Sequence, residues 1–156
     1  MLARGLALAT LIALCVPSAA QADHTEDDPS DILGVWSFQT QPYRDGACLM
    51  TGTMHLSHDE EDGVYDCELT ALEMCSLWGQ SIVRQSCTAR RFGDQVSVRS
   101  QIAEVLERKG EFEDMQFNYV PDNFALTVKS SMRMYGSLVS AVNAPVEFRR
   151  SDEGVS

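Results

Sequence analysis

Apolar and polar residues alternate with a period of two in nine short segments between residues 36 and 148. The intervening positions are mostly polar or charged, which is typical of β-strands that bury one face. The pattern therefore predicts nine short strands. The apolar positions that share a face are, in chain order, Trp36 and Phe38; Met50, Gly52, Met54 and Leu56; Tyr65, Cys67, Leu69 and Ala71; Val83, Cys87 and Ala89; Val96, Val98 and Ile102; Met115, Phe117 and Tyr119; Phe124, Leu126 and Val128; Met132, Met134 and Leu138; and Val146 and Phe148.

Turn-forming residues separate these segments, for example at Asp62-Gly63, Gly93-Asp94 and Lys109-Gly110. Evenly spaced strands joined by tight turns predict an antiparallel up-and-down meander. A meander with one apolar face has two exposed edges unless it closes, so we expect an all-β barrel of eight or nine strands. The segment 101–109 fits a strand end or a short helix equally well.

The first 22 residues have the features of a cleaved signal peptide: Arg4, an apolar stretch from Leu6 to Val16, and the small-x-small residues 20–22. The apolar stretch is roughly half of the ~20 residues that a membrane-spanning helix needs, so no membrane span is expected. The predicted organisation is a signal peptide at 1–22, a flexible acidic lead-in at 23–31, a barrel domain at 32–150 and a disordered tail at 151–156. A periplasmic or secreted protein is the expectation.

The chain is acidic, with a formal net charge of −11 that becomes −12 when Arg4 is removed with the signal. Nucleic acids and anionic lipid surfaces are bound through basic surfaces. The charge therefore argues against both as the main partner.

Four cysteines remain after the signal peptide, and an even number in an exported chain predicts disulfides. A hairpin around Asp62-Gly63 with Ser57 opposite Val64 brings Cys48 close to Cys75. The next hairpin, around residues 76–79, places Cys67 opposite Cys87. We therefore predict the disulfides Cys48–Cys75 and Cys67–Cys87. The spacing lacks the Cys-x-x-Cys pairs that are typical of zinc sites.

The histidines do not form a recognisable metal-binding or catalytic motif. His55 and His58 precede the acidic run 59–62, but His55 is on the predicted outer face and the run lacks the ligand spacing of a calcium loop. We interpret this region as a solvated hairpin tip that holds no metal. Because no nucleophile motif or Ser/His/Asp spacing is present either, a protein without enzymatic activity or a cofactor is predicted.

The inner face offers a candidate binding site, because methionine is a flexible and polarizable lining for apolar pockets. Ordinary core filling and a copper(I) site are the alternatives. Small inward residues (Gly52, Ala71, Ala89, Ser100 and Gly136) either leave room for a ligand or relieve crowding where strands bend. Our leading hypothesis is an exported protein that holds a small apolar or amphipathic ligand in the barrel interior or mouth. The predicted lining residues are Trp36, Phe38, Met50, Met54, Met132 and Met134.

The first predicted strand starts with Gly34-Val35-Trp36, and Arg149 or Arg150 on the last strand is placed to cover the tryptophan. This combination resembles the one found in lipocalin-type barrels. It is also similar to the small exported barrels that inhibit bacterial metalloproteases. The resemblance covers the architecture of residues 32–150 and implies a fold. The inhibitor type inserts its N-terminal segment into an enzyme cleft. This implies an alternative function, a protein-interaction module such as a periplasmic protease inhibitor or envelope assembly factor that contacts its partner through residues 23–31 or an exposed loop. Nothing in the pattern determines the oligomeric state.

Overall fold

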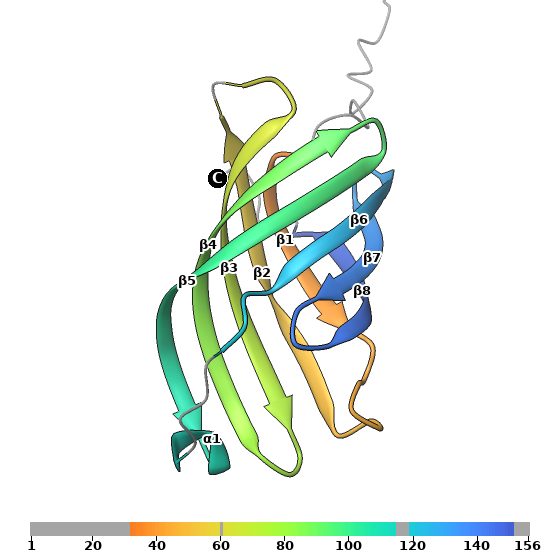
Figure 1. The fold of residues 1–156 in the computed structure, drawn as a ribbon. Coiled ribbons are helices and arrows are strands. Elements are labelled where there is room, and N and C mark those ends of the chain that lie inside the picture. Colours follow the sequence, from red (N-terminus) through yellow and green to blue (C-terminus); the bar gives the residue numbers. More distant parts are fainter. Residues whose placement is uncertain (1–31, 60, 115–118, 152–156) are drawn as a thin grey trace, which may run out of the picture.

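Eight antiparallel strands form a closed barrel in the computed structural model, which describes residues 32–59, 61–114 and 119–151 (Figure 1). Each strand pairs with the next along the chain, and the last pairs with the first, so the predicted all-β barrel is confirmed. The strands are β1 (Gly34–Thr40), β2 (Cys48–His58), β3 (Val64–Cys75), β4 (Gly79–Phe92), β5 (Gln95–Lys109), β6 (Asn123–Ser130), β7 (Arg133–Val139) and β8 (Asn143–Arg150).

Several predicted features lie outside the described residues. They are the signal peptide at 1–22, the lead-in at 23–31, and all of the C-terminal tail except Ser151. The predicted strand near residues 115–119 is also mostly outside them, and its last residue, Tyr119, is not in a strand. Among the described residues, no helix is long and apolar enough to cross a membrane.

The segment 101–109, which the sequence left open, belongs to strand β5. A one-turn helix, α1 (Glu111–Asp114), follows it. β5 pairs with β4 along its length but with β6 only from Gln95 to Val98. In Figure 1, β2 to β5 therefore extend past β6 at the end of the barrel near α1, which we call the lower mouth.

Both predicted disulfides are present, and each joins residues that are directly opposite in neighbouring strands: Cys48–Cys75 between β2 and β3, and Cys67–Cys87 between β3 and β4. The β2–β3 register differs from the expectation by two residues, because Ser57 lies opposite Asp66. A shift of two leaves every side chain on its predicted face, since strand side chains alternate.

Aromatic rings fill the closed part of the barrel. Phe38 stacks on Phe148 with ring centroids 5.0 Å apart, and Phe124 meets both rings edge-on at 5.3 and 5.1 Å. Trp36 is fully buried and donates its indole N–H to the Ile32 carbonyl at 2.9 Å. Burial of these rings is the main stabilising contribution expected in such a small core.

Glycines in the strands show how tightly the barrel is packed. A Cβ on Gly52 would lie 2.1 Å from the Thr70 carbonyl oxygen and 2.6 Å from the Phe38 ring. A Cβ on Gly136 would lie 1.9 Å from the Ala125 carbonyl oxygen. At these two positions the missing side chain allows close approach of neighbouring strands, as expected where small inward residues relieve crowding.

Arg150 is the arginine that covers the early tryptophan. Its guanidinium lies 4.8 Å from the centre of the Trp36 ring and donates hydrogen bonds to the carbonyls of Leu33 and Ser131. The neighbouring Arg149 points to the outer face. Arg150 thus connects β8 to the start of β1 and to the β6–β7 turn.

Candidate functional site at the lower mouth

The six side chains predicted to line a ligand site divide into two groups. Trp36, Phe38, Met50, Met54 and Met134 are 0–3% exposed and belong to the packed core. Their ligand-lining role stays a prediction. The inner-face position predicted for Met132 is wrong. This residue lies between the end of β6 and the start of β7 and is 39% exposed, because the turn interrupts the alternation there.

Towards the lower mouth the interior becomes polar. Glu73 projects inward from β3 and is 9% exposed, and Tyr43 donates its hydroxyl to Glu73 Oε1 at 2.7 Å. Tyr43 is held by the β1–β2 loop, in which its backbone N–H and C=O both bond to Cys48. Arg44, Asp45 and Gly46 make the reversal with positive φ, a conformation that glycine and aspartate adopt more readily than most residues.

Asp122 is held inside the barrel just before β6 and is 1% exposed. Gln85 of β4 binds it twice, donating to Asp122 Oδ2 at 2.7 Å and accepting from its backbone N–H at 2.9 Å. Tyr119 also donates to Oδ2 at 2.7 Å, and Ser100 of β5 donates to the Asp122 carbonyl at 2.6 Å. These bonds fasten residues 119–122 to the inner faces of β4 and β5.

The two carboxyl groups affect each other and the tyrosines. The pKa of Asp122 is raised from 3.8 to about 6. Burial is the main cause and the Glu73 charge adds to it, while the hydrogen bonds from Tyr119 and Gln85 and the nearby Ser140 hydroxyl act in the opposite direction. The pKa values of Tyr43 and Tyr119 are raised, first by burial and then by their acidic partners. Glu73 and Asp122 contribute to the shifts of both tyrosines, so these four side chains form one electrostatic unit.

Two buried oxygen atoms in this region have no hydrogen-bond partner among the described residues: Asp122 Oδ1 and Ser81 Oγ. The nearby Ser140 hydroxyl donates instead to the Val120 carbonyl, at 3.1 Å. Ser81 is 3% exposed and lies directly opposite Glu73 in the β3–β4 register. A buried polar atom without a partner costs about 1–3 kcal/mol. A hydrogen-bond donor that enters the interior would remove that cost at Asp122.

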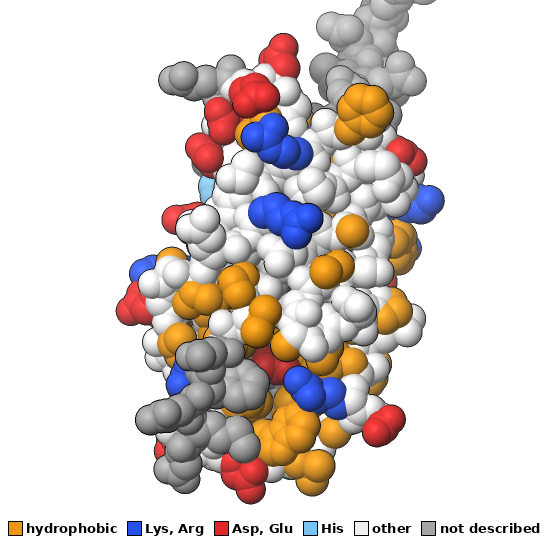
Figure 2. Space-filling view, in the orientation of Figure 1, with side chains coloured by type: hydrophobic (Ala, Val, Ile, Leu, Met, Phe, Trp, Pro, Cys, Tyr) orange, Lys and Arg blue, Asp and Glu red, His pale blue; other side chains and the backbone are white. Residues whose placement is uncertain are grey.

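The rim of the lower mouth combines apolar and charged groups. On β5, Ile102 and Val105 take the register positions opposite the inward Gln85 and Val83, yet they are 36% and 37% exposed. Arg108 takes the position opposite Ser81, so a basic side chain is placed at this rim as well as the two carboxyl groups. Figure 2 shows an acidic side chain with hydrophobic ones and a basic one beside it towards this end of the molecule.

The Cys48–Cys75 disulfide borders the mouth. Its two sulfur atoms and a Glu73 carboxylate oxygen lie within 4.8 Å of one another. The sulfurs are bonded to each other, so they are not thiolate ligands for a metal. His55 and His58, the other residues considered for metal binding, are exposed on β2.

Sequence reasoning missed the polar cluster, although part of it had a signal. Glu73 shares the face of Leu69 and Ala71, and Gln85 shares the face of Val83, so both were polar residues at inward positions. Asp122 had no signal, because Pro121-Asp122-Asn123 has the composition of an exposed turn.

A cavity of about 950 Å³ lies on the outer face of the barrel and not in its interior. Its walls come mainly from outward side chains of β1, β2, β3 and β8. We call it the outer groove. The polar lower mouth and the outer groove are thus two further candidate sites beside the methionine-lined interior, whose ligand-binding role stays a prediction.

Together these features define a small, closed, disulfide-linked β-barrel with a polar lower mouth. No protein-family model and no curated protein matches the chain. A solved structure of a de novo designed fluorescence-activating β-barrel is similar to it, with a TM-score of 0.46 and 17% sequence identity, over 76% of this chain and 93% of that chain.

Proposed function

We propose that this chain is an exported, non-enzymatic binding protein that holds a small amphipathic ligand with a cationic, hydrogen-bond-donating head at the lower mouth. The observation that carries the proposal is Asp122 Oδ1, an enclosed carboxyl oxygen without a donor among the described residues. It shares its interior with a second acidic group, Glu73.

The two carboxyl groups select the ligand head. Glu73 is the more exposed of the two, at 9% against 1% for Asp122. Hydrogen bonds to a charged partner contribute about 1.5–3 kcal/mol, which favours a protonated amine over a neutral hydroxyl. A carboxylate head would be disfavoured by repulsion.

The rim selects the ligand tail. Ile102 and Val105 present partly exposed apolar surface on the inner side of β5, next to the acidic interior. An apolar tail that covers them is removed from water at about 25 cal/mol per Å² of buried area. The expected ligand class is therefore an organic ammonium ion with an apolar substituent.

Isothermal titration with linear alkylammonium ions and with the alcohols of the same length tests this function. We expect the ammonium ions to bind, longer chains to bind better, and the alcohols to bind roughly tenfold more weakly or not at all. The Asp122 pKa of about 6 implies that affinity for ammonium rises between about pH 5 and pH 7, as this carboxyl group ionises.

The variant Glu73→Gln should weaken ammonium binding roughly tenfold, because it removes the charge and keeps the shape. Glu68→Gln is the matched control, since Glu68 is exposed on the outer face of the same strand. Equal binding of ammonium ions and alcohols, or equal effects of the two variants, would contradict the proposal.

A chain that lacks residues 23–31 separates this function from the alternative of a protein-interaction module. A barrel-mouth site keeps its affinity for ammonium ions without the lead-in. A module that inserts the lead-in into a partner loses partner binding.

A further inference from the structure

The outer groove is built from two rows of side chains that run across the strands. The strand registers align Arg149 of β8, Ser37 of β1, Thr53 of β2 and Thr70 of β3 in the first row. The second row contains Tyr135, Glu147, Gln39, Thr51, Leu72 and Ile82, from β7 to β4. All of them point away from the core, because they alternate with buried neighbours.

The lining is rich in groups that both donate and accept hydrogen bonds. Ser37, Thr51, Thr53 and Thr70 contribute hydroxyls, and Gln39 contributes an amide. Adjacent strands lie about 4.8 Å apart, so the rows from β8 to β4 extend over roughly 20 Å. An elongated ligand that crosses the strands would meet a polar side chain at nearly every strand.

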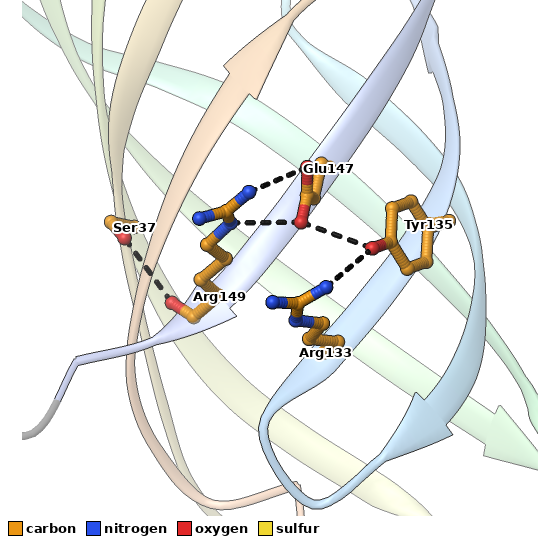
Figure 3. A network of polar contacts seen from close by, with 5 residues as sticks. All are labelled: Ser37, Arg133, Tyr135, Glu147 and Arg149. Carbon is orange, nitrogen blue, oxygen red and sulfur yellow. Dashed lines mark hydrogen bonds and ion pairs between the residues drawn. The ribbon is translucent and has the colours of Figure 1, made fainter.

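The charged groups at one end of the groove are already paired with each other. Glu147 accepts two hydrogen bonds from the Arg149 guanidinium, at 2.8 and 3.2 Å, and a third from the Tyr135 hydroxyl at 3.1 Å. Arg133 donates to the same hydroxyl at 3.3 Å. Figure 3 shows these side chains side by side on β7 and β8, with the Ser37 hydroxyl of β1 bonded to the Arg149 carbonyl.

This pairing indicates the charge of the ligand. The Glu147 carboxylate lowers the attraction that Arg149 would have for a phosphate or sulfate, and the net charge of the whole chain is −11. The paired Arg149 guanidinium and Glu147 carboxylate still place hydrogen-bond donors and acceptors side by side. This combination suits neighbouring hydroxyl groups on one sugar ring. Tyr135 and Leu72 add apolar surface for the ring faces.

We propose that the outer groove is a binding site for a neutral carbohydrate chain that lies across the strands from β8 to β4. This site is separate from the lower mouth. The two sites share strand β3, where Leu72 points into the groove and Glu73 into the interior. Alternation along one strand thus gives each face its own chemistry.

Heteronuclear NMR titration of the full chain with short neutral glucans and N-acetylglucosamine oligomers tests this site. We expect shifts at the backbone amides of the two rows, and longer oligomers binding more tightly than monosaccharides. If none of these oligosaccharides binds, or if the shifts map elsewhere, the proposal is overturned.

The double variant Thr51→Val and Thr53→Val removes two hydroxyls and keeps the side-chain shape, and it should weaken binding roughly tenfold. Thr88→Val is the matched control, because Thr88 is on the outer face of β4 outside the groove. Ser37→Trp, which obstructs the groove, should abolish binding. Unchanged binding in the double variant and in Ser37→Trp would overturn the proposal.

A sulfated oligosaccharide and an uncharged extended peptide distinguish the other ligand classes. Preferential binding of either one would contradict a neutral carbohydrate site. Glu73→Gln should leave oligosaccharide binding unchanged. The experiments therefore test the outer groove and the lower mouth independently.

Discussion

Asp122 carries a carboxyl group that the barrel encloses almost completely. Hydrogen bonds from Tyr119 and Gln85 lower its pKa, yet burial outweighs them and the pKa rises to about 6. The folded protein therefore holds a proton at Asp122 more tightly than the unfolded chain does. Because one oxygen of this group has no donor among the described residues, Asp122 is also the side chain whose protonation state matters most for the proposed mouth site.

The raised pKa of Asp122 predicts a pH dependence of stability. The stabilising contribution of the bound proton is fully present below the unfolded pKa of 3.8 and is lost as pH rises through about 6. The free energy of unfolding should fall by up to about 3 kcal/mol across this interval through this one group. Asp122→Asn should remove that part of the slope, as measured by urea unfolding at several pH values.

Asp66→Asn is the control for this measurement, since Asp66 is exposed on β3. This variant should leave the change in unfolding free energy between about pH 4 and pH 6 the same as in the unaltered protein. If the free energies of unfolding of Asp122→Asn and the unaltered protein differed by the same amount at every pH, the pKa of Asp122 would not be raised by folding.

At the scale of elements, β3 is the strand that the disulfides hold on both sides. Cys75 connects its end to β2, and Cys67 connects its first half to β4. The two bridges close segments of similar length, with sequence separations of 27 and 20 residues. Their contributions to stability should be similar, because the entropy of the unfolded chain depends only weakly on loop length.

Replacing either pair of cysteines by alanine should lower the free energy of unfolding by roughly 3 kcal/mol. The two replacements should differ in function. Only Cys48–Cys75 borders Glu73, so only its removal should weaken alkylammonium binding in folded protein. The Cys67–Cys87 variant is the matched control, and an equal loss of binding in both would argue against a site beside Glu73.

At the scale of the whole molecule, closure of the barrel depends on the contact between the last strand and the first. The β8–β1 pairing is reinforced by Arg150, which covers Trp36 and binds backbone carbonyls from two other segments. Closure gives every strand two hydrogen-bonded neighbours. The paired edges are thereby protected from edge-to-edge association with other molecules.

Arg150→Met should lower the free energy of unfolding by roughly 2 kcal/mol, because it removes a cation–π contact and two hydrogen bonds while keeping a long apolar side chain. Urea unfolding at neutral pH measures the change. Arg149→Met is the control and should stay close to the unaltered protein, because Arg149 is solvent-exposed. Equal effects of the two variants would mean that Arg150 does not stabilise the closure.

Much of the fold was predictable because strand geometry is local. The alternation of Met50 and Met54 with polar neighbours placed both on the inner face, and the hairpin geometry paired Cys67 with Cys87. The prediction for Met132 failed because alternation cannot show where a strand ends in a turn. Glu73 was at a predictable inward position, but its partner Tyr43 comes from a loop whose path no periodicity describes.

The sequence by itself determined the strand faces, the turns and the disulfide partners, since these follow from a repeat of two residues and from neighbours in adjacent hairpins. Only the tertiary structure decided that Asp122 lies inside the barrel, that Arg150 and not Arg149 covers Trp36, and that a cavity of about 950 Å³ lies on the outer face. These features depend on contacts between segments that are distant in the chain, which a local repeat does not describe.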